Sequence, residues 1–332
     1  KMKILGKFPS TRLRRVRNFD WIRRLVSENN LSSSDLILPI FIRDGKNKIE
    51  KINSMPGVYR YSLNKLSSIL DKAEKFNIPM IALFPNTPDN KKDKYGSEAL
   101  NENNLVCTAL RQIKKKYKKF GIMTDVALDP YTSHGHDGIM INNKIDNDET
   151  LKILSEQALL QAAMGSDIIA PSDMMDGRIG LIRKSLDKNQ FKDTKILSYA
   201  VKYASNFYGP FRDAVGSKKK LKGDKKTYQM DMRNYTEALR EVGLDIKEGA
   251  DFVMVKPGMP YLDIISLIKK SFKIPVFSYQ VSGEYSMIMN AIKNKSLNQN
   301  AIFESLISLK RAGSNAIITY FALDIAKKIR LT

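Results

Sequence analysis

Eight short apolar segments alternate with amphipathic stretches along most of the chain, and this repeat constrains the fold more than any other feature. The segments are rich in Ile, Val, Leu and Phe and are shorter than buried helices, so they predict β-strands. They cover residues 36–42, 78–84, 122–128, 167–171, 195–201, 251–256, 274–280 and 316–321. Helical patterns lie between them, for example at residues 149–164, 232–244 and 301–312. Continuous apolar strands joined by helices indicate a parallel sheet, and eight of them favour an α/β fold closed into a (β/α)8 TIM barrel.

The first 35 residues do not fit this repeat. Residues 11–26 read TRLRRVRNFDWIRRLV. A disordered basic leader is not expected to contain large apolar residues such as Phe19, Trp21 and Leu25. We therefore expect an N-terminal arm at residues 1–35 that packs on a neighbouring subunit. Residues 36–332 are expected to form one catalytic barrel domain.

The net charge of +21 raises nucleic acid or an anionic membrane as a partner. The lysine runs, such as residues 114–116 and 218–220, are scattered and lack interleaved aromatic residues, which favours solvated faces. The sequence contains no run of 18 apolar residues, so no membrane span is predicted, and its first ten residues lack the apolar region of a secretory signal. The single cysteine, Cys107, excludes a disulfide framework and a zinc site built from several thiolates. We expect a cytoplasmic protein with neither a nucleic-acid nor a membrane partner.

Two lysines end neighbouring predicted strands. Lys256 closes the apolar run DFVMV, and Lys202 follows SYAV at the end of the strand before it. Barrel enzymes place their active sites at the carboxyl ends of the strands, where burial and a second cation lower the pKa of an amine and make it a nucleophile. The alternative is that each lysine extends from the rim to solvent or binds a phosphate.

Other polar residues also gather at the predicted strand ends. Residues 125–138, DVALDPYTSHGHDG, contain both histidines and three aspartates. This pattern fits a site for a hard metal ion, a general acid/base group or a hydrogen-bonded loop. Arg212 in GPFRD, with Lys225 and Gln229 further on, would suit recognition of a carboxylate, although an ordinary solvated loop has the same composition.

Four long segments resemble those of the porphobilinogen synthase (5-aminolevulinate dehydratase) family: APSDMMDGRIG, SYAVKYASNFYGPFRDA, VMVKPGMPYLDII and YQVSGEY. The resemblance covers nearly the whole chain, including the arm and the segment MPGVYRYS. It implies a lyase, specifically a hydro-lyase of tetrapyrrole and haem biosynthesis. Such enzymes condense two molecules of 5-aminolevulinate to porphobilinogen through lysine Schiff bases, with loss of water.

The resemblance also implies roles for individual residues. Lys256 is similar to the lysine that holds the P-side substrate and Lys202 to the lysine of the A side, with the carboxylate of Asp125 aimed at both. The P-side substrate would be contacted by Tyr279, Ser282 and Tyr320. The A-side substrate would be contacted by Ser172, Asp173, Tyr208, Phe211, Arg212, Lys225 and Gln229.

The sequence departs from the family at three positions of chemical importance. Many members bind a catalytic zinc through three cysteines, and those positions here read Ala127, Asp129 and Asp137. Thiolate ligation is therefore excluded, and the two aspartates would suit Mg²⁺, a monovalent ion or no ion at all. The resemblance also implies Mg²⁺ bound outside the active site by Glu241 of EALREVG, and a homo-octamer held together by the arm.

Two other functions remain as alternatives. A class I aldolase would use one lysine and a phosphate-binding loop, so the second lysine and the carboxylate-binding set argue against it. A basic RNA- or membrane-binding protein would show salt-dependent binding.

Overall fold

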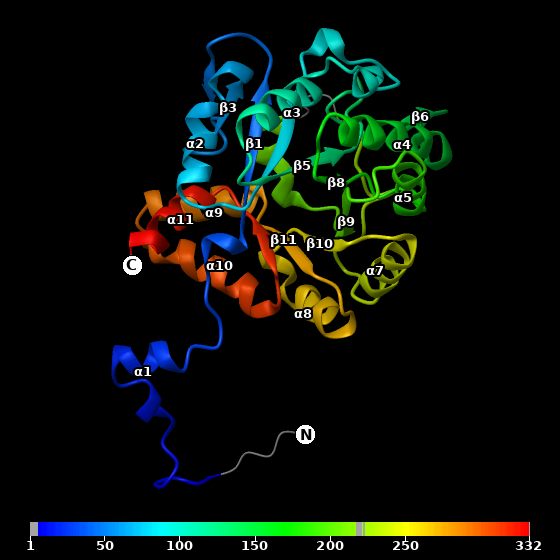
Figure 1. Cartoon of the computed structure of the whole chain (residues 1–332). Coiled ribbons are helices and arrows are strands. Elements are labelled where there is room, and N and C mark those ends of the chain that lie inside the picture. The colour runs from blue at the N-terminus through cyan, green and yellow to red at the C-terminus, as the bar shows by residue number, and fades with distance from the viewer. Residues whose placement is uncertain (1–5, 217–220, 222, 332) are drawn as a thin grey trace.

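Eight parallel strands form a closed barrel at the centre of the molecule (Figure 1). The computed structural model describes residues 6–216, 221 and 223–331. Within those residues, the barrel strands are β1 (Leu36–Arg43), β4 (Met80–Asn86), β5 (Gly121–Val126), β8 (Ile168–Pro171), β9 (Lys195–Lys202), β10 (Phe252–Lys256), β11 (Val276–Tyr279) and β12 (Ala316–Ile318). They pair in chain order, and β12 pairs with β1 to close the ring. The (β/α)8 barrel predicted from the apolar segments is confirmed.

Helices cover the outside of the barrel. Each strand is followed by an outer helix, in order α2 (Ser67–Lys75), α3 (Leu105–Lys116), α4 (Asn147–Ala163), α5 (Arg178–Lys188), α7 (Glu237–Glu248), α8 (Leu262–Ser271), α10 (Asn300–Ala312) and α11 (Ala322–Leu331). The first seven residues of β1 are all buried, because one face of the strand meets the barrel interior and the other meets the helices. In the part of the chain described, no helix combines the length and the apolar character needed to cross a membrane.

Short additional elements surround the carboxyl ends of the strands. Two hairpins, β2 (Ile49–Lys51) with β3 (Tyr59–Ser62) and β6 (Ile139–Ile141) with β7 (Lys144–Asp146), extend the loops after β1 and β5. Two further helices, α6 (Gly209–Ala214) and α9 (Ser282–Lys293), follow β9 and β11 and pack together. Single 3₁₀ turns occur at Ser33–Asp35, Leu63–Lys65, Asp89–Lys91, Ser97–Leu100, Asn206–Tyr208 and Met259–Tyr261. Apart from the 12-residue α9, these elements are too short to produce a sequence period. The sequence predicted none of them.

Several predicted boundaries were wrong, by up to five residues. The helix predicted at 232–244 begins only at Glu237, because the carboxylate of Asp231 accepts the backbone N–H of Arg233 and forms a turn there. The strand predicted at 122–128 ends at Val126, since the N–H of Leu128 is donated to the carbonyl of Asp137 in the following loop. The strand predicted at 316–321 ends at Ile318, where the chain turns into α11.

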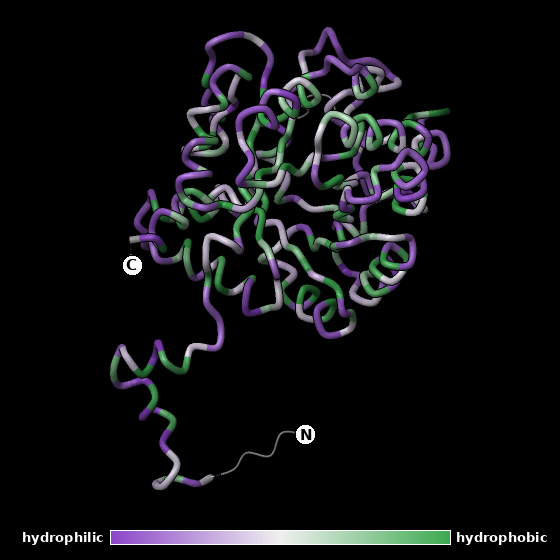
Figure 2. Tube along the Cα trace, in the orientation of Figure 1, coloured by the Kyte–Doolittle hydropathy of each residue, from purple (hydrophilic) through white to green (hydrophobic). Residues whose placement is uncertain are grey.

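The segment before β1 extends away from the barrel (Figure 1). It contains a 3₁₀ turn at Leu13–Val16 and the short helix α1 (Asp20–Leu25). The rings of Phe19 and Trp21 stack on each other and remain 61% and 59% exposed. Figure 2 shows apolar residues alternating with polar ones along this arm. An exposed apolar strip of this kind is typical of a surface that contacts another chain.

Candidate active site

Lys256 and Lys202 are direct neighbours across two barrel strands. Each is the last residue of its strand, and their Cα atoms are register partners in the parallel pair of β10 and β9. A bulge creates this register: Tyr199 and Ala200 of β9 together lie opposite the single residue Met254 of β10. Bulges of this kind redirect side chains next to active sites. As a result, two buried lysine residues, 7% and 5% exposed, lie side by side at the carboxyl end of the barrel.

Aromatic rings surround the amine of Lys256. Its Nζ lies 4.8–5.3 Å from four ring centroids, those of Tyr199, Tyr208, Phe211 and Tyr279. Burial in this apolar setting, with the nearby charge of Lys202, lowers the pKa of Lys256 to about 7. A large fraction of this amine is therefore unprotonated at neutral pH, which is the form that attacks a carbonyl carbon.

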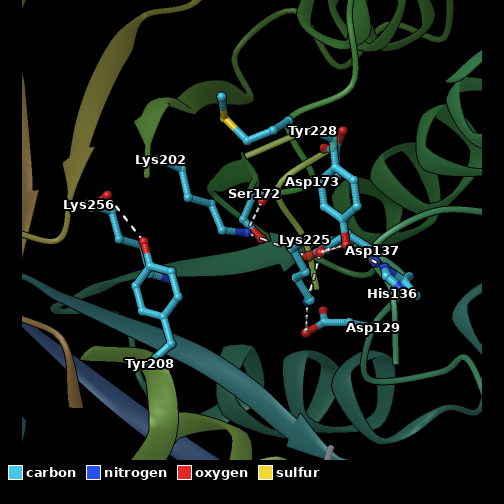
Figure 3. A network of polar contacts seen from close by, with 12 residues as sticks. Asp129, His136, Asp137, Ser172, Asp173, Lys202, Tyr208, Lys225, Tyr228 and Lys256 are labelled. Carbon is cyan, nitrogen blue, oxygen red and sulfur yellow. Dashed lines mark hydrogen bonds and ion pairs between the residues drawn. The ribbon is translucent and has the colours of Figure 1, made fainter. Parts of the chain in front are cut away.

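Lys202 is held by the loop that follows β8. Its Nζ donates to the carbonyl oxygen of Ser172 and lies 3.5 Å from Oδ1 of Asp137 (Figure 3). Asp137 comes from the loop after β5, so residues from three neighbouring strand ends meet at this amine. Its two acceptors fix its direction next to Lys256.

A compact ion cluster continues from Asp137. The Nζ of Lys225 lies 2.7 Å from Oδ2 of Asp137 and 3.3 Å from Oδ2 of Asp129, and the hydroxyl of Tyr228 donates to Asp137 at 2.8 Å (Figure 3). Burial alone would raise the pKa of Asp137, but the charges of Lys202 and Lys225 outweigh it and hold that pKa well below its usual range. Asp137 is therefore a carboxylate at neutral pH.

Two other buried carboxyl groups have raised pKa values. Burial, with the charge of Asp129, raises the pKa of Asp125 on β5 to about 6. Its Oδ1 is buried without a hydrogen-bond partner among the described residues. Burial also raises the pKa of Asp173 to about 6, although the nearby Arg178 opposes this shift. Groups that titrate this close to neutral pH can both take up and release a proton.

The junction of α6 and α9 forms one wall of the site. The hydroxyl of Ser282, the first residue of α9, accepts the backbone N–H of Phe211 at 2.8 Å. A Cβ at Gly283 would lie 2.4 Å from the carbonyl oxygen of Phe207. Only glycine therefore allows α9 to lie this close to the backbone of the 3₁₀ turn Asn206–Tyr208. The hydroxyls of Tyr279 and Tyr320 are 2.9 Å apart.

The three residues predicted to bind a carboxylate come from α6 and the segment that follows it. Arg212 lies on α6 next to Phe211, and the buried Oε1 of Gln229 lacks a hydrogen-bond partner among the described residues. Lys225 is occupied by Asp129 and Asp137. The lysine run at 218–220, interpreted above as a solvated face, lies outside the described residues.

The histidine-containing loop is a packed, hydrogen-bonded structure. His134 and His136 are 6% and 5% exposed. The backbone carbonyl of His136 accepts the hydroxyl of Thr132, and its Nδ1 lies 3.0 Å from the hydroxyl of Tyr228. Of the three interpretations of residues 125–138, the contacts of the histidines favour the hydrogen-bonded loop.

Sequence reasoning missed Glu284, a fully buried carboxylate that joins two strand ends. It accepts backbone N–H groups from Val281 at 2.6 Å, Met259 at 2.5 Å and Gly258 at 3.3 Å. The loop that follows Lys256 is thereby fixed to the start of α9. A glutamate as the third residue of a helix is a known N-terminal signal, but the sequence did not predict this helix.

Glu241 lies apart from the lysines, in a cavity of about 950 Å³. The cavity is lined by His136 and Tyr228, but by neither Lys202 nor Lys256. Five carboxylates face it: Asp176, Asp224, Asp231, Glu237 and Glu241. Burial raises the pKa of Glu241 to about 6. This cavity is therefore a second, acidic region beyond Tyr228.

A closed barrel with polar side chains gathered at the carboxyl ends of its strands is the architecture of a (β/α)8-barrel enzyme, and two buried lysines lie side by side there. Comparison with known proteins then identifies the family. The family model for "Delta-aminolevulinic acid dehydratase" matches residues 10–328. The chain belongs to this family.

Similar proteins agree over almost the full length. A delta-aminolevulinic acid dehydratase from Bradyrhizobium diazoefficiens is 56% identical, over 96% of this chain and 91% of its own. One from Methanothermus sociabilis is 52% identical, over 97% of this chain and 100% of its own. The crystal structure of the Toxoplasma gondii enzyme in complex with the reaction product porphobilinogen superposes with a TM-score of 0.93 at 43% identity, covering 96% of this chain and 91% of that one.

Proposed function

We propose that this chain is a porphobilinogen synthase that condenses two molecules of 5-aminolevulinate through Schiff bases on Lys256 and Lys202. The observation that carries the proposal is the register pairing of the two lysines, in a chain that belongs to the dehydratase family. Two amines next to each other allow two ketone substrates to be held side by side. A reaction between separate molecules then becomes effectively intramolecular.

The chemistry follows from the amines and the buried carboxyl groups. An unprotonated lysine amine attacks the ketone carbon, and loss of one water leaves an imine. A protonated imine withdraws electrons from the neighbouring carbon, so a base can remove a proton there and generate the carbon nucleophile. Asp125, whose pKa is about 6, has the burial and position to exchange such protons.

The surrounding residues are proposed to orient the two substrates. Tyr279, Ser282 and Tyr320 would receive the substrate on Lys256. The ring of Tyr279 faces that amine and its hydroxyl contacts Tyr320, while Ser282 bonds to Phe211, whose ring also faces the amine. The substrate on Lys202 would be contacted by Ser172, Asp173, Tyr208, Phe211, Arg212, Lys225 and Gln229. The experiment that tests the function is colorimetric detection of a pyrrole from 5-aminolevulinate. Aldol cleavage without pyrrole formation would favour the class I aldolase instead.

The acid limb of the pH profile is expected near pH 7. Lys256 has a lowered pKa of about 7, so below that pH the amine is protonated and loses its nucleophilic lone pair. The value of kcat/KM should therefore fall about tenfold per pH unit on the acid side, with the enzyme active above it. Steady-state assays from pH 5 to pH 9 would measure this limb. A limb near the ordinary lysine pKa of roughly 10 would contradict a lowered pKa at Lys256.

We also propose a zinc-independent enzyme that responds to Mg²⁺ bound at Glu241. The carboxylates that line the Glu241 cavity suit a hard cation, and Mg²⁺ commonly uses one or two carboxylates and keeps several waters. Zinc independence is supported by the residues themselves, because Ala127, Asp129 and Asp137 supply no thiolate.

Activity is expected to survive EDTA, to rise with added Mg²⁺ and to gain nothing from Zn²⁺. Glu241→Gln should abolish the rise with Mg²⁺, because it removes a charged ligand. Glu237→Gln is the matched control, since Glu237 lies on the same helix and faces the same cavity. The measurement is initial rate against ion concentration after chelation. Inactivation that only zinc reverses would disprove zinc independence.

The arm is proposed to hold a homo-octamer together. Its exposed Phe19 and Trp21 supply apolar surface for a second copy of the chain. Deleting residues 1–30 is expected to convert octamers into smaller species in sedimentation velocity runs. Unchanged octamers would exclude this role. A cytoplasmic location and the absence of nucleic-acid binding stay predictions.

A further inference from the structure

Lys225 occupies the place between two carboxylates where an active-site cation would bind. Its Nζ contacts Asp129 at 3.3 Å and Asp137 at 2.7 Å, and the three side chains are only 9%, 12% and 1% exposed. These two aspartates are the oxygen donors considered above for an active-site ion. The third position of that set is Ala127, whose methyl group offers no donor. The expected ligand set is therefore reduced to two groups that already share a cation.

The charges of this cluster balance without a metal. Lys202 and Lys225 supply two positive charges, and Asp129 and Asp137 supply two negative ones. Lys225 lies between two carboxylates, and opposite charges this close favour its ammonium form. A divalent ion bound to the same oxygens would lie next to this ammonium in a buried site, where repulsion between like charges is strong.

The acceptor positions of Asp137 are also largely in use. A carboxylate offers about four lone-pair positions. Oδ2 of Asp137 receives Tyr228 and Lys225, and Oδ1 faces Lys202. About three of the four positions are thus taken, so a metal ion at Asp137 would have to share the carboxylate with two ammonium groups. An active-site metal therefore does not fit the residues present.

We propose that the ammonium of Lys225 is the resident cation of the Asp129–Asp137 pair and excludes metal ions from the active site. An ammonium group has three N–H donors, and the two aspartates use two of them. The third is left for a substrate carboxylate, which deepens the role proposed above for Lys225. The inference rests on the proposed active site, but metal binding is measured without substrate. Its failure is thus distinguishable from a failure of the Schiff-base chemistry.

The test counts bound Mn²⁺ by electron paramagnetic resonance, in protein that carries Glu241→Gln to remove the proposed Mg²⁺ site. Adding Lys225→Ala leaves two buried carboxylates without their shared cation. The expected result is one additional Mn²⁺ per chain relative to Glu241→Gln alone. Adding Asp129→Asn should remove this extra ion again. Lys225→Arg, which keeps the charge, should bind no extra ion.

Two outcomes would overturn the inference. One is a Lys225→Ala protein that is folded by circular dichroism and binds no more Mn²⁺ than its parent. The other is seen with Lys225 intact: if Asp129→Asn lowers the Mn²⁺ count of the Glu241→Gln protein, a metal shares the site with the ammonium. This second comparison does not need Lys225→Ala to fold. The inference is supported if Asp129→Asn leaves the Mn²⁺ count of the Glu241→Gln protein unchanged and Lys225→Ala adds one Mn²⁺ per chain.

Discussion

Replacing Lys256 with alanine is expected to lower kcat by on the order of 10⁴-fold or more, the scale seen when a covalent nucleophile is removed. The reason is that Lys256 is the amine with the lowered pKa, and its loss removes the attack that begins the reaction. The measurement is the initial rate of pyrrole formation. In parallel, borohydride reduction in the presence of 5-aminolevulinate should attach substrate to Lys256 in the unaltered protein, as detected by peptide mass spectrometry.

The matched control is Lys270→Ala. Lys270 is an exposed lysine on α8, so its removal changes the net charge equally without touching the barrel mouth. Its activity should stay within about twofold of the unaltered protein, since surface changes of this kind have small effects. Full activity in Lys256→Ala, or substrate trapped only on other lysines, would disprove the role of Lys256.

Replacing Arg178 with methionine is expected to reduce the free energy of unfolding by about 3–5 kcal/mol, the scale for breaking a buried ion pair from one side. Arg178 begins α5 and is 2% exposed. Its guanidinium lies 3.4 Å from Asp245 on α7 and 3.7 Å from Asp173 beside the active site. Methionine fills similar space but leaves both carboxylates buried without their cation. Urea unfolding followed by circular dichroism at fixed protein concentration would measure the loss.

Arg240→Met provides the comparison for this stability prediction. Arg240 is exposed on α7, the helix that carries Asp245, so its replacement makes the same chemical change at the surface. A change within about 0.5 kcal/mol is expected there. Equal effects of the two substitutions would show that the buried network contributes nothing beyond the loss of an arginine.

The parts of the fold that could be predicted from the sequence are those with a local period. The continuous apolar run of β1 and its counterparts needs only neighbouring residues to be recognised, and the lysines that end two such runs could be placed at the barrel mouth for the same reason. The role of Glu284 was not predictable in this way. Its partners Gly258 and Met259 lie 26 and 25 positions earlier in the chain, and backbone N–H groups carry no sequence signal.

The environment of Lys225 shows a different limit. Composition indicated a cation that could bind a carboxylate, and that chemistry is present. Its observed partner Asp129 lies 96 positions away, and the contact exists only because the segment that carries Lys225 folds back over the end of β9. The sequence predicted the type of group, while the closed barrel determined which acid it meets.

The bulge opposite Met254 also limits how this active site can be altered. Side chains of a regular strand alternate between faces, so Tyr199 and Lys202, three positions apart, would point to opposite sides of the barrel wall. The extra residue of β9 lets the ring of Tyr199 lie against Lys256 while Lys202 also turns inward. Deleting one residue from β9 would direct one of them into the helix layer, even with every catalytic residue type retained. A design that transfers this pair of amines to another barrel must therefore include the extra residue of β9 as well as the two lysines.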